Sequence, residues 1–131
     1  MTGLDTNVLV RYIMQDDVRQ SRLASELIET FTVDEPGFVP LVAVIELVWV
    51  LLSSFELART QVVQALEVLL RTKEIRVENA ATIWRAVRLY RAGAADFADC
   101  LIERSATASG CTRTMTFDRG AVKHCAMTMI G

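Results

Sequence analysis

The chain is poor in the residues that several kinds of active site require. It has one histidine, His124, which excludes RNA cleavage by two histidines acting as acid and base. The phosphate-binding loop GxxxxGK(S/T), the dinucleotide fingerprint GxGxxG and the nucleophile elbow GxSxG are all missing. The sequence therefore does not predict the nucleotide-binding or serine-hydrolase sites that these motifs mark.

Cysteine is scarce as well, with Cys100, Cys111 and Cys125 odd in number and without CxxC spacing. We interpret them as reduced thiols of a cytosolic protein, mostly filling the core. Cys125 follows His124, but a zinc site needs about four ligands and adjacent side chains point apart. A zinc site is not expected.

The chain also lacks a long apolar run and an excess of positive charge. Its longest apolar stretch, 38–52, is interrupted by Pro40 and Glu46, whereas a membrane span needs about 20 apolar residues. No signal peptide is visible, so we expect a cytoplasmic protein without membrane contact. The net charge of −2 gives no overall field that attracts nucleic acid, so an RNA substrate would need local arginines or bound cations.

The length of 131 residues predicts one domain, 1–131. With 52% hydrophobic residues, the chain has more apolar surface than a small monomer hides, which indicates a dimer or a stable partner. Short apolar runs alternate with helical patterns. Strands are predicted at 1–4, 37–39, 75–77, 111–116 and 126–129, and helices at 6–13, 17–31, 41–53, 60–71, 79–91 and 96–108. This order is typical of an α/β fold with a parallel sheet covered on both faces.

Two acids follow predicted strands. Asp5 comes after the first strand and Asp118 after the fourth, and α/β sheets bind ligands outside the carboxyl ends of their strands. Either acid could instead only cap the following helix or turn. Both interpretations remain open.

Glu46 is the acid that the pattern makes hardest to explain structurally. It lies in a segment, 41–53, that is apolar nearly all round and is predicted to be buried between layers. Its neighbours at helical spacing are all apolar, namely Val42, Ala43, Trp49 and Val50. An ionised carboxylate there costs several kcal/mol unless it is paired or binds a metal. No lysine or arginine lies within 31–54, so the alternative is a long-range salt bridge.

Three further acids share one face of the helix predicted over 96–108. Asp96 is predicted as its N-cap and Asp99 as its third residue, a capping-box-like pair. The helix dipole favours the charge of Asp99, and nearby backbone N–H groups could meet a phosphate. Glu103 either adds a further carboxylate to the cluster or has the structural role of pairing with Arg104 or a more distant base.

A cluster of Asp5, Glu46, Asp99 and Asp118 would need a counter-charge. Unit charges about 4 Å apart repel by roughly 4 kcal/mol at an effective dielectric near 20. Oxygen-only ligands favour Mg²⁺ or Mn²⁺ over zinc, and such ions can activate water for attack on phosphorus. The sequence therefore predicts a metal-dependent phosphodiesterase.

Four segments, taken together and in order, resemble the PIN-domain ribonucleases, most closely the VapC toxins of toxin–antitoxin pairs: GLDTNVLVRYIMQDD, VIELVWVL, ADFADCLIERSA and TMTFDRGA. The resemblance covers nearly the whole chain. It implies a three-layer α/β/α sandwich with a central, mostly parallel sheet of four to five short strands. It also implies a Mg²⁺- or Mn²⁺-dependent endoribonuclease that acts as the toxin of such a pair.

The resemblance assigns roles to individual residues. It implies that Asp5, Glu46, Asp99 and Asp118 are catalytic, with Asp5, Asp99 and Asp118 as metal ligands. Thr6 and Thr116 match hydroxyl positions beside the metal, Asn7 would brace the acids, and Asp96 would support them. The chain departs from the pattern at Glu103-Arg104 and at Gly120-Ala121, where relatives carry small and bulkier residues respectively.

Substrate and partners follow from the arginines and from the resemblance. Arg85, Arg88 and Arg91 recur every three residues and could track an RNA backbone, although a solvated helix face explains them as well. Arg11 and Arg119 are candidates for phosphate contact. The resemblance implies a homodimer and a cognate antitoxin that lays an amphipathic segment between the first helices, with DNA contacted only through the antitoxin.

Two other functions remain open at this stage. The chain could be a PIN-like module that binds RNA or a protein partner without cleaving, or a related metal-dependent DNA nuclease or phosphatase. The complete set of four acids favours a cleaving enzyme, but acids alone do not distinguish RNA from DNA.

Overall fold

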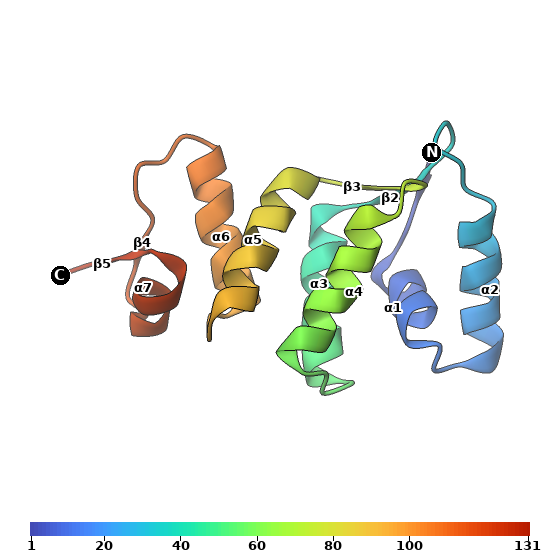
Figure 1. The fold of residues 1–131 in the computed structure, drawn as a ribbon, viewed down its shortest axis with the longest axis horizontal. Coiled ribbons are helices and arrows are strands. Elements are labelled where there is room, and N and C mark those ends of the chain that lie inside the picture. The colour runs from blue at the N-terminus through green and yellow to red at the C-terminus, as the bar shows by residue number, and fades with distance from the viewer. The chain divides into compact units, whose positions relative to one another are not determined.

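A computed structural model describes all residues, 1–131, and the chain forms two compact units in it. The first unit is Met1–Glu78 and the second is Asn79–Gly131 (Figure 1). Each unit is described by itself. The predicted alternation of strands and helices is present in both, and the strands of both are parallel, so the α/β class is confirmed.

The first unit is a three-stranded parallel sheet with four helices. Its elements are β1 Thr2–Gly3, α1 Thr6–Met14, α2 Val18–Glu29, β2 Gly37–Val39, α3 Leu41–Ser53, α4 Arg59–Arg71 and β3 Ile75–Val77. The strand order is β1-β2-β3, with Phe38 of β2 opposite Gly3 and Arg76. Helical crossovers join the strands, as parallel pairing requires. Each carboxyl end of a strand is therefore followed by the start of a helix or a turn.

The core of the first unit is aliphatic. Its fully buried side chains include Leu9, Val39, Val44, Leu47, Leu51, Val62 and Leu66. Gly37 lets β2 approach the aromatic ring of Phe31, since a Cβ at this position would lie 2.6 Å from a ring carbon. Any larger residue would force the ring or the strand to move.

The helix α3 corrects one expectation. Its sequence predicts burial all round, but a stripe of four large side chains is exposed, namely Val42, Ile45, Trp49 and Leu52. The opposite face, which includes Leu47 and Leu51, is buried. A helix that is apolar on every side has no polar stripe to mark its outer face, so its sequence cannot indicate which face packs. No helix in the structure combines the length and the apolar character that a membrane crossing would need.

The second unit consists of three helices and a pair of short strands. Its elements are α5 Ala80–Ala92, α6 Phe97–Ala108, β4 Met115–Thr116, α7 Arg119–Cys125 and β5 Thr128–Met129. The strands β4 and β5 are parallel, with Met115 opposite Thr128. The rings of Tyr90 and Phe97 pack edge to face at 5.5 Å between centroids. The five strands of the chain thus form a three-stranded and a two-stranded sheet.

Two details of this unit differ from the prediction. The strand expected over 111–116 is only Met115–Thr116, and the helix α7 is an element that the sequence pattern does not predict. The helix has seven residues and includes Gly120, so its apolar periodicity is too short to detect. Asp118, which the pattern places at the end of a strand, is the N-cap of this helix.

Candidate metal and RNA site

Asp5 lies where β1 ends and α1 begins. It is the N-cap of α1, and its Oδ1 accepts a hydrogen bond of 2.7 Å from the backbone N–H of Thr6. The capping role considered from the sequence is therefore real. It engages Oδ1 and leaves the other carboxylate oxygen, Oδ2, outside the cap, so capping and metal binding are compatible at this residue.

The two residues after Asp5 differ in their surroundings. Thr6 is only 6% exposed, and its Oγ1 has no hydrogen-bond partner, which is unusual for a buried hydroxyl. Asn7 is exposed, and the structure shows no hydrogen bond from its side chain to the acids that it was predicted to brace. The hydroxyl of Thr6 is the polar atom next to Asp5 that is left free to bind a further group.

Glu46 lies on the exposed side of α3, among the apolar stripe of that helix. No salt bridge or hydrogen bond engages its carboxylate, so the long-range ion pair considered from the sequence is not found. The expected desolvation cost was wrong, because it assumed that α3 is buried on all sides. Glu46 is instead a solvated carboxylate, free to bind a cation.

Asp96 and Asp99 stand at the start of α6 as the sequence predicted. Asp96 is the N-cap, and its Oδ1 accepts a hydrogen bond of 3.1 Å from the backbone N–H of Asp99. This capping bond accounts for Asp96 and fixes the first turn of the helix. Asp99 is partly buried on that turn, with its carboxylate not engaged by the cap.

Asp118 is held by a second cap. Its Oδ1 accepts a hydrogen bond of 2.8 Å from the backbone N–H of Gly120, and its own N–H donates to Thr116 Oγ1 at 2.9 Å. Thr116 therefore positions the backbone of Asp118, rather than standing free beside a metal. The small Gly120 allows this tight turn, because a Cβ there would lie 3.2 Å from Asp118 Oδ1.

Asp96, Asp99 and Asp118 form the acidic cluster of the second unit. Burial raises the pKa of Asp99, and the charges of Asp96 and Asp118 raise it further. Like charges at short range oppose ionisation of the group between them. The structure thus brings together three of the predicted site residues in one unit, and their mutual repulsion favours a bound cation or proton.

Glu103 is the only buried charged side chain of the chain, at 7% exposure. Its Oε1 accepts a hydrogen bond of 2.8 Å from Thr107 Oγ1. Its Oε2 lies 3.2 Å from Arg104 Nε without hydrogen-bond geometry and has no other partner. The pairing with Arg104 considered from the sequence is present. It satisfies the charge, but not the full hydrogen-bonding capacity of the carboxylate.

Two cysteines pack beside the acidic cluster. Cys100 and Cys125 are fully buried, with their Sγ atoms 3.8 Å apart, whereas Cys111 is exposed. Burial raises the pKa of the Cys125 thiol, and the charges of Asp99, Asp96 and Glu103 raise it further. Both buried thiols are core residues, as expected, and the raised pKa keeps Cys125 protonated and unreactive.

The predicted RNA-binding arginines lie in both units. Arg85, Arg88 and Arg91 share the exposed face of α5, and Arg119 is exposed at the first residue of α7. Arg11 is already engaged, since its Nη1 lies 2.8 Å from Asp16 Oδ2 and its Nε donates to Gln20 Oε1 at 2.8 Å. Arg119 is the better placed of the two arginines predicted to contact phosphate.

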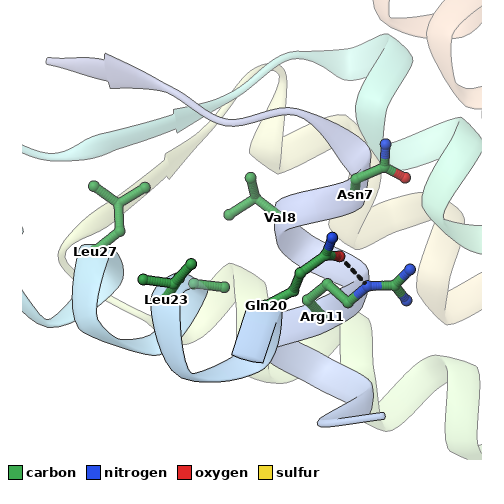
Figure 2. Close-up of a pocket in the computed structure, with 7 residues that line it drawn as sticks. Asn7, Val8, Arg11, Gln20, Leu23 and Leu27 are labelled. Carbon is green, nitrogen blue, oxygen red and sulfur yellow. Dashed lines mark hydrogen bonds between the residues drawn. The ribbon is translucent and has the colours of Figure 1, made fainter. Parts of the chain in front are cut away.

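A groove of about 500 Å³ runs between α1 and α2 (Figure 2). Its lining residues are Asn7, Val8, Arg11, Gln20, Leu23, Ala24 and Leu27. Leu23 and Leu27 are 44% and 38% exposed. One end of the groove is apolar, and the other carries the hydrogen-bonded pair Arg11 and Gln20. The groove lies between the first helices, where the resemblance noted from the sequence implies an antitoxin segment, although the apolar periodicity alone does not locate it.

The donor atoms in both units fit a hard divalent cation. The candidate ligands are carboxylate oxygens, which Mg²⁺ and Mn²⁺ prefer, and the two thiols packed beside the acidic cluster are buried. In neither unit do three acidic, histidine or cysteine side chains already lie in a metal-binding arrangement. Burial and the neighbouring charges of Asp96 and Asp118, which together raise the pKa of Asp99, favour a cation at this place.

Comparison with known proteins is consistent with this chemistry. Residues 4–126, which run through both units, match the family model of the PIN domain. A VapC ribonuclease of Aquifex aeolicus (strain VF5) is 28% identical over 119 residues, which cover 91% of this chain and 88% of the relative. The chain belongs to the PIN domain family.

Proposed function

We propose that the protein is a Mg²⁺- or Mn²⁺-dependent endoribonuclease that acts in the cytoplasm as the toxin of a toxin–antitoxin pair. The observation that carries the proposal is the acidic cluster of Asp96, Asp99 and Asp118, where burial and then the neighbouring charges raise the pKa of Asp99. Membership of the PIN family and the VapC ribonuclease among its relatives support it. When bound, the ion supplies positive charge that activates water and offsets the charge of the phosphate.

The residues of the chain divide the remaining work. Asp5 is the proposed metal ligand of the first unit, Asp99 and Asp118 are those of the second, and Glu46 would orient water or substrate. Thr116 and Asp96 fix the backbone turns that carry Asp118 and Asp99, through bonds of 2.9 and 3.1 Å. Thr6 Oγ1, which is buried and free, hydrogen-bonds to a group held by Asp5. Arg119 contacts a phosphate, and the exposed arginines of α5 extend that contact.

The test is cleavage of defined single-stranded RNA and DNA with Mg²⁺, with Mn²⁺ and with EDTA. Asp99→Asn removes a ligand, and Asp34→Asn is the matched control, because Asp34 is exposed and unpaired in a loop. We expect wild type and Asp34→Asn to cut RNA only with the ion, and Asp99→Asn to fail. Cleavage that survives EDTA, or that Asp99→Asn retains, would contradict the mechanism.

The alternatives are separate outcomes of the same assay. RNA binding without cleavage by the wild type would identify a non-cleaving module. Cleavage of DNA as fast as RNA would identify a metal-dependent DNA nuclease, because a metal-activated water does not need the 2′-hydroxyl.

The groove between α1 and α2 is the proposed site of the antitoxin. An amphipathic segment would bury apolar side chains against Leu23 and Leu27, and its basic residues would face the acids. We expect the short reading frame beside the gene to encode a protein that co-purifies with this one. Leu23→Ser with Leu27→Ser should abolish the complex, whereas Val33→Ser, at another exposed apolar site, should not.

We also propose a single three-layer domain over 1–131 and a homodimer. The length of 131 residues supports the single domain, and the 52% of hydrophobic residues supports the dimer. Light scattering after size exclusion measures the mass of the species. A monomer at micromolar concentration would contradict the dimer.

A further inference from the structure

Phe117 is a large side chain left in solvent beside the acidic cluster. It is 78% exposed and lies between the strand β4 and the helix α7. Single exposed apolar residues are common on protein surfaces, so exposure alone assigns nothing. Its position is what sets it apart, because the next residue, Asp118, is the N-cap of α7 and one of the proposed metal ligands.

The backbone around Phe117 is fixed on both sides. Before it, Thr114 and Thr116 accept backbone hydrogen bonds of 2.8 and 3.0 Å from Thr128 and Ile130. After it, the turn is closed by the bonds of Thr116 and Asp118 described above. Side chains alternate along an extended segment, so the hydroxyl of Thr116 turns toward the cap while Met115 and Phe117 turn outward. The ring is therefore presented to solvent by a rigid support.

Two exposed arginines lie within four residues of Phe117 along the chain. Arg113 and Arg119 take part in no ion pair and no side-chain hydrogen bond. An exposed aromatic ring together with exposed arginines is a combination that binds single-stranded nucleic acid, with the ring stacking on a base and the cations contacting phosphates.

We propose that Phe117, with Arg113 and Arg119, forms a platform for one unpaired nucleobase of single-stranded RNA, next to the phosphate that is cut. The inference rests on the proposed ribonuclease function and deepens it. Phe117 touches substrate but holds neither ion nor water. Its role is to fix the register of the strand, so that the phosphate beside the stacked base reaches the acids.

The physical role predicts distinct consequences for affinity and for salt dependence. Stacking is sequence-tolerant and strongest for purines, so the platform should prefer oligoadenylate over oligouridylate. Loss of the ring should lower affinity about 5- to 150-fold, the usual range for one stacked base. It should leave the salt dependence unchanged, whereas loss of one phosphate contact reduces the slope of log K against log salt by about 0.7.

The experiment measures fluorescence anisotropy of labelled oligoadenylate and oligouridylate in an Asp99→Asn background, which prevents cleavage. Phe117→Ala, Phe117→Trp and Arg119→Gln are compared with Val33→Ala, which truncates an exposed side chain elsewhere. We expect Phe117→Ala to weaken binding and remove the purine preference, and Phe117→Trp to restore both. Arg119→Gln should lower the salt slope. Steady-state kinetics in the active background should show the Phe117→Ala defect in KM rather than in kcat.

Several results would overturn the inference. Equal affinity of Phe117→Ala and Val33→Ala for oligoadenylate would show that the ring does not bind a base. If the wild type still cleaved RNA, the ribonuclease proposal would be unaffected by that result. A fall of several degrees in the melting temperature of Phe117→Ala would show that the ring supports the fold instead. A wild type that neither binds nor cuts RNA would refute both proposals together.

Discussion

The two units place their acids in opposite surroundings. In the first unit, Asp5 and Glu46 come from separate elements, and Glu46 has no charged partner. In the second unit, Asp96, Asp99 and Asp118 gather at the starts of two helices, and Glu103 is buried one turn further along α6. The first unit therefore has the larger aliphatic core, and each of its two candidate acids stands on its own element. The second concentrates negative charge that only a cation or a proton can relieve.

Each unit also keeps one buried oxygen without a hydrogen bond. In the first it is Thr6 Oγ1, directly after Asp5, and in the second it is Glu103 Oε2, four residues after Asp99. Buried polar atoms without partners are rare in folded proteins. Each of the two atoms lies close in sequence to a proposed metal ligand, Asp5 or Asp99.

The largest expected effect is on RNA cleavage. It compares the loss of a single acid of the first unit, Asp5, with the loss of a clustered acid, Asp99. Mutating a residue that only orients a metal ligand lowers metal affinity or activity by about 10- to 100-fold. Loss of a direct ligand should therefore reduce cleavage by about 10³-fold or more. We expect this loss for Asp5→Asn and for Asp99→Asn alike, measured as kcat/KM on one RNA. Full activity of Asp5→Asn would show that this acid is not needed for cleavage.

The next effect concerns the two cores. Leu66 and Phe97 are buried in the first and second unit respectively. Truncation of either to alanine should cost about 2–5 kcal/mol of unfolding free energy, through lost burial and the cavity left behind. If the chain is one cooperative domain, both variants lower the same single thermal transition. Two transitions, each shifted by one variant only, would show that the units fold independently.

A smaller effect is expected at the buried carboxylate of Glu103. Thr107→Val removes its only hydrogen bond while nearly preserving shape, and should destabilise the protein by about 1–3 kcal/mol. Thr107→Ser keeps the hydroxyl and serves as the control. Denaturant unfolding measures both, and equal stability of the two variants would show that Arg104 alone satisfies Glu103.

The smallest effect is a pH-dependent gain in stability. The pKa of Asp99 in the folded state is raised above the ordinary value of 3.8, so its ionised form destabilises the fold. The penalty is absent below that value and complete above the raised pKa. Asp99→Asn should therefore melt higher than wild type at neutral pH in EDTA, with the difference vanishing at low pH. A variant that is less stable at neutral pH would contradict the crowding.

The sequence predicted the strands at 37–39 and 75–77 and most helices within one or two residues, because strong apolar periodicity and caps such as Asp96 mark them. It could not predict α7, which is too short for periodicity, or the exposed face of α3, which is apolar on all sides. For Glu46 the physical argument failed, since it assumed a burial that the helix does not have. Asp96 and Asp99 were placed correctly because capping chemistry is local.

The central claim is that a divalent ion binds at the acidic cluster of the second unit, with Asp99 among its ligands. Titration calorimetry with Mn²⁺ at neutral pH tests it directly, on wild type, Asp99→Asn and the control Asp34→Asn. We predict that wild type and Asp34→Asn bind with the same affinity and stoichiometry, and that binding is lost in Asp99→Asn. Undiminished Mn²⁺ binding by Asp99→Asn would contradict the claim.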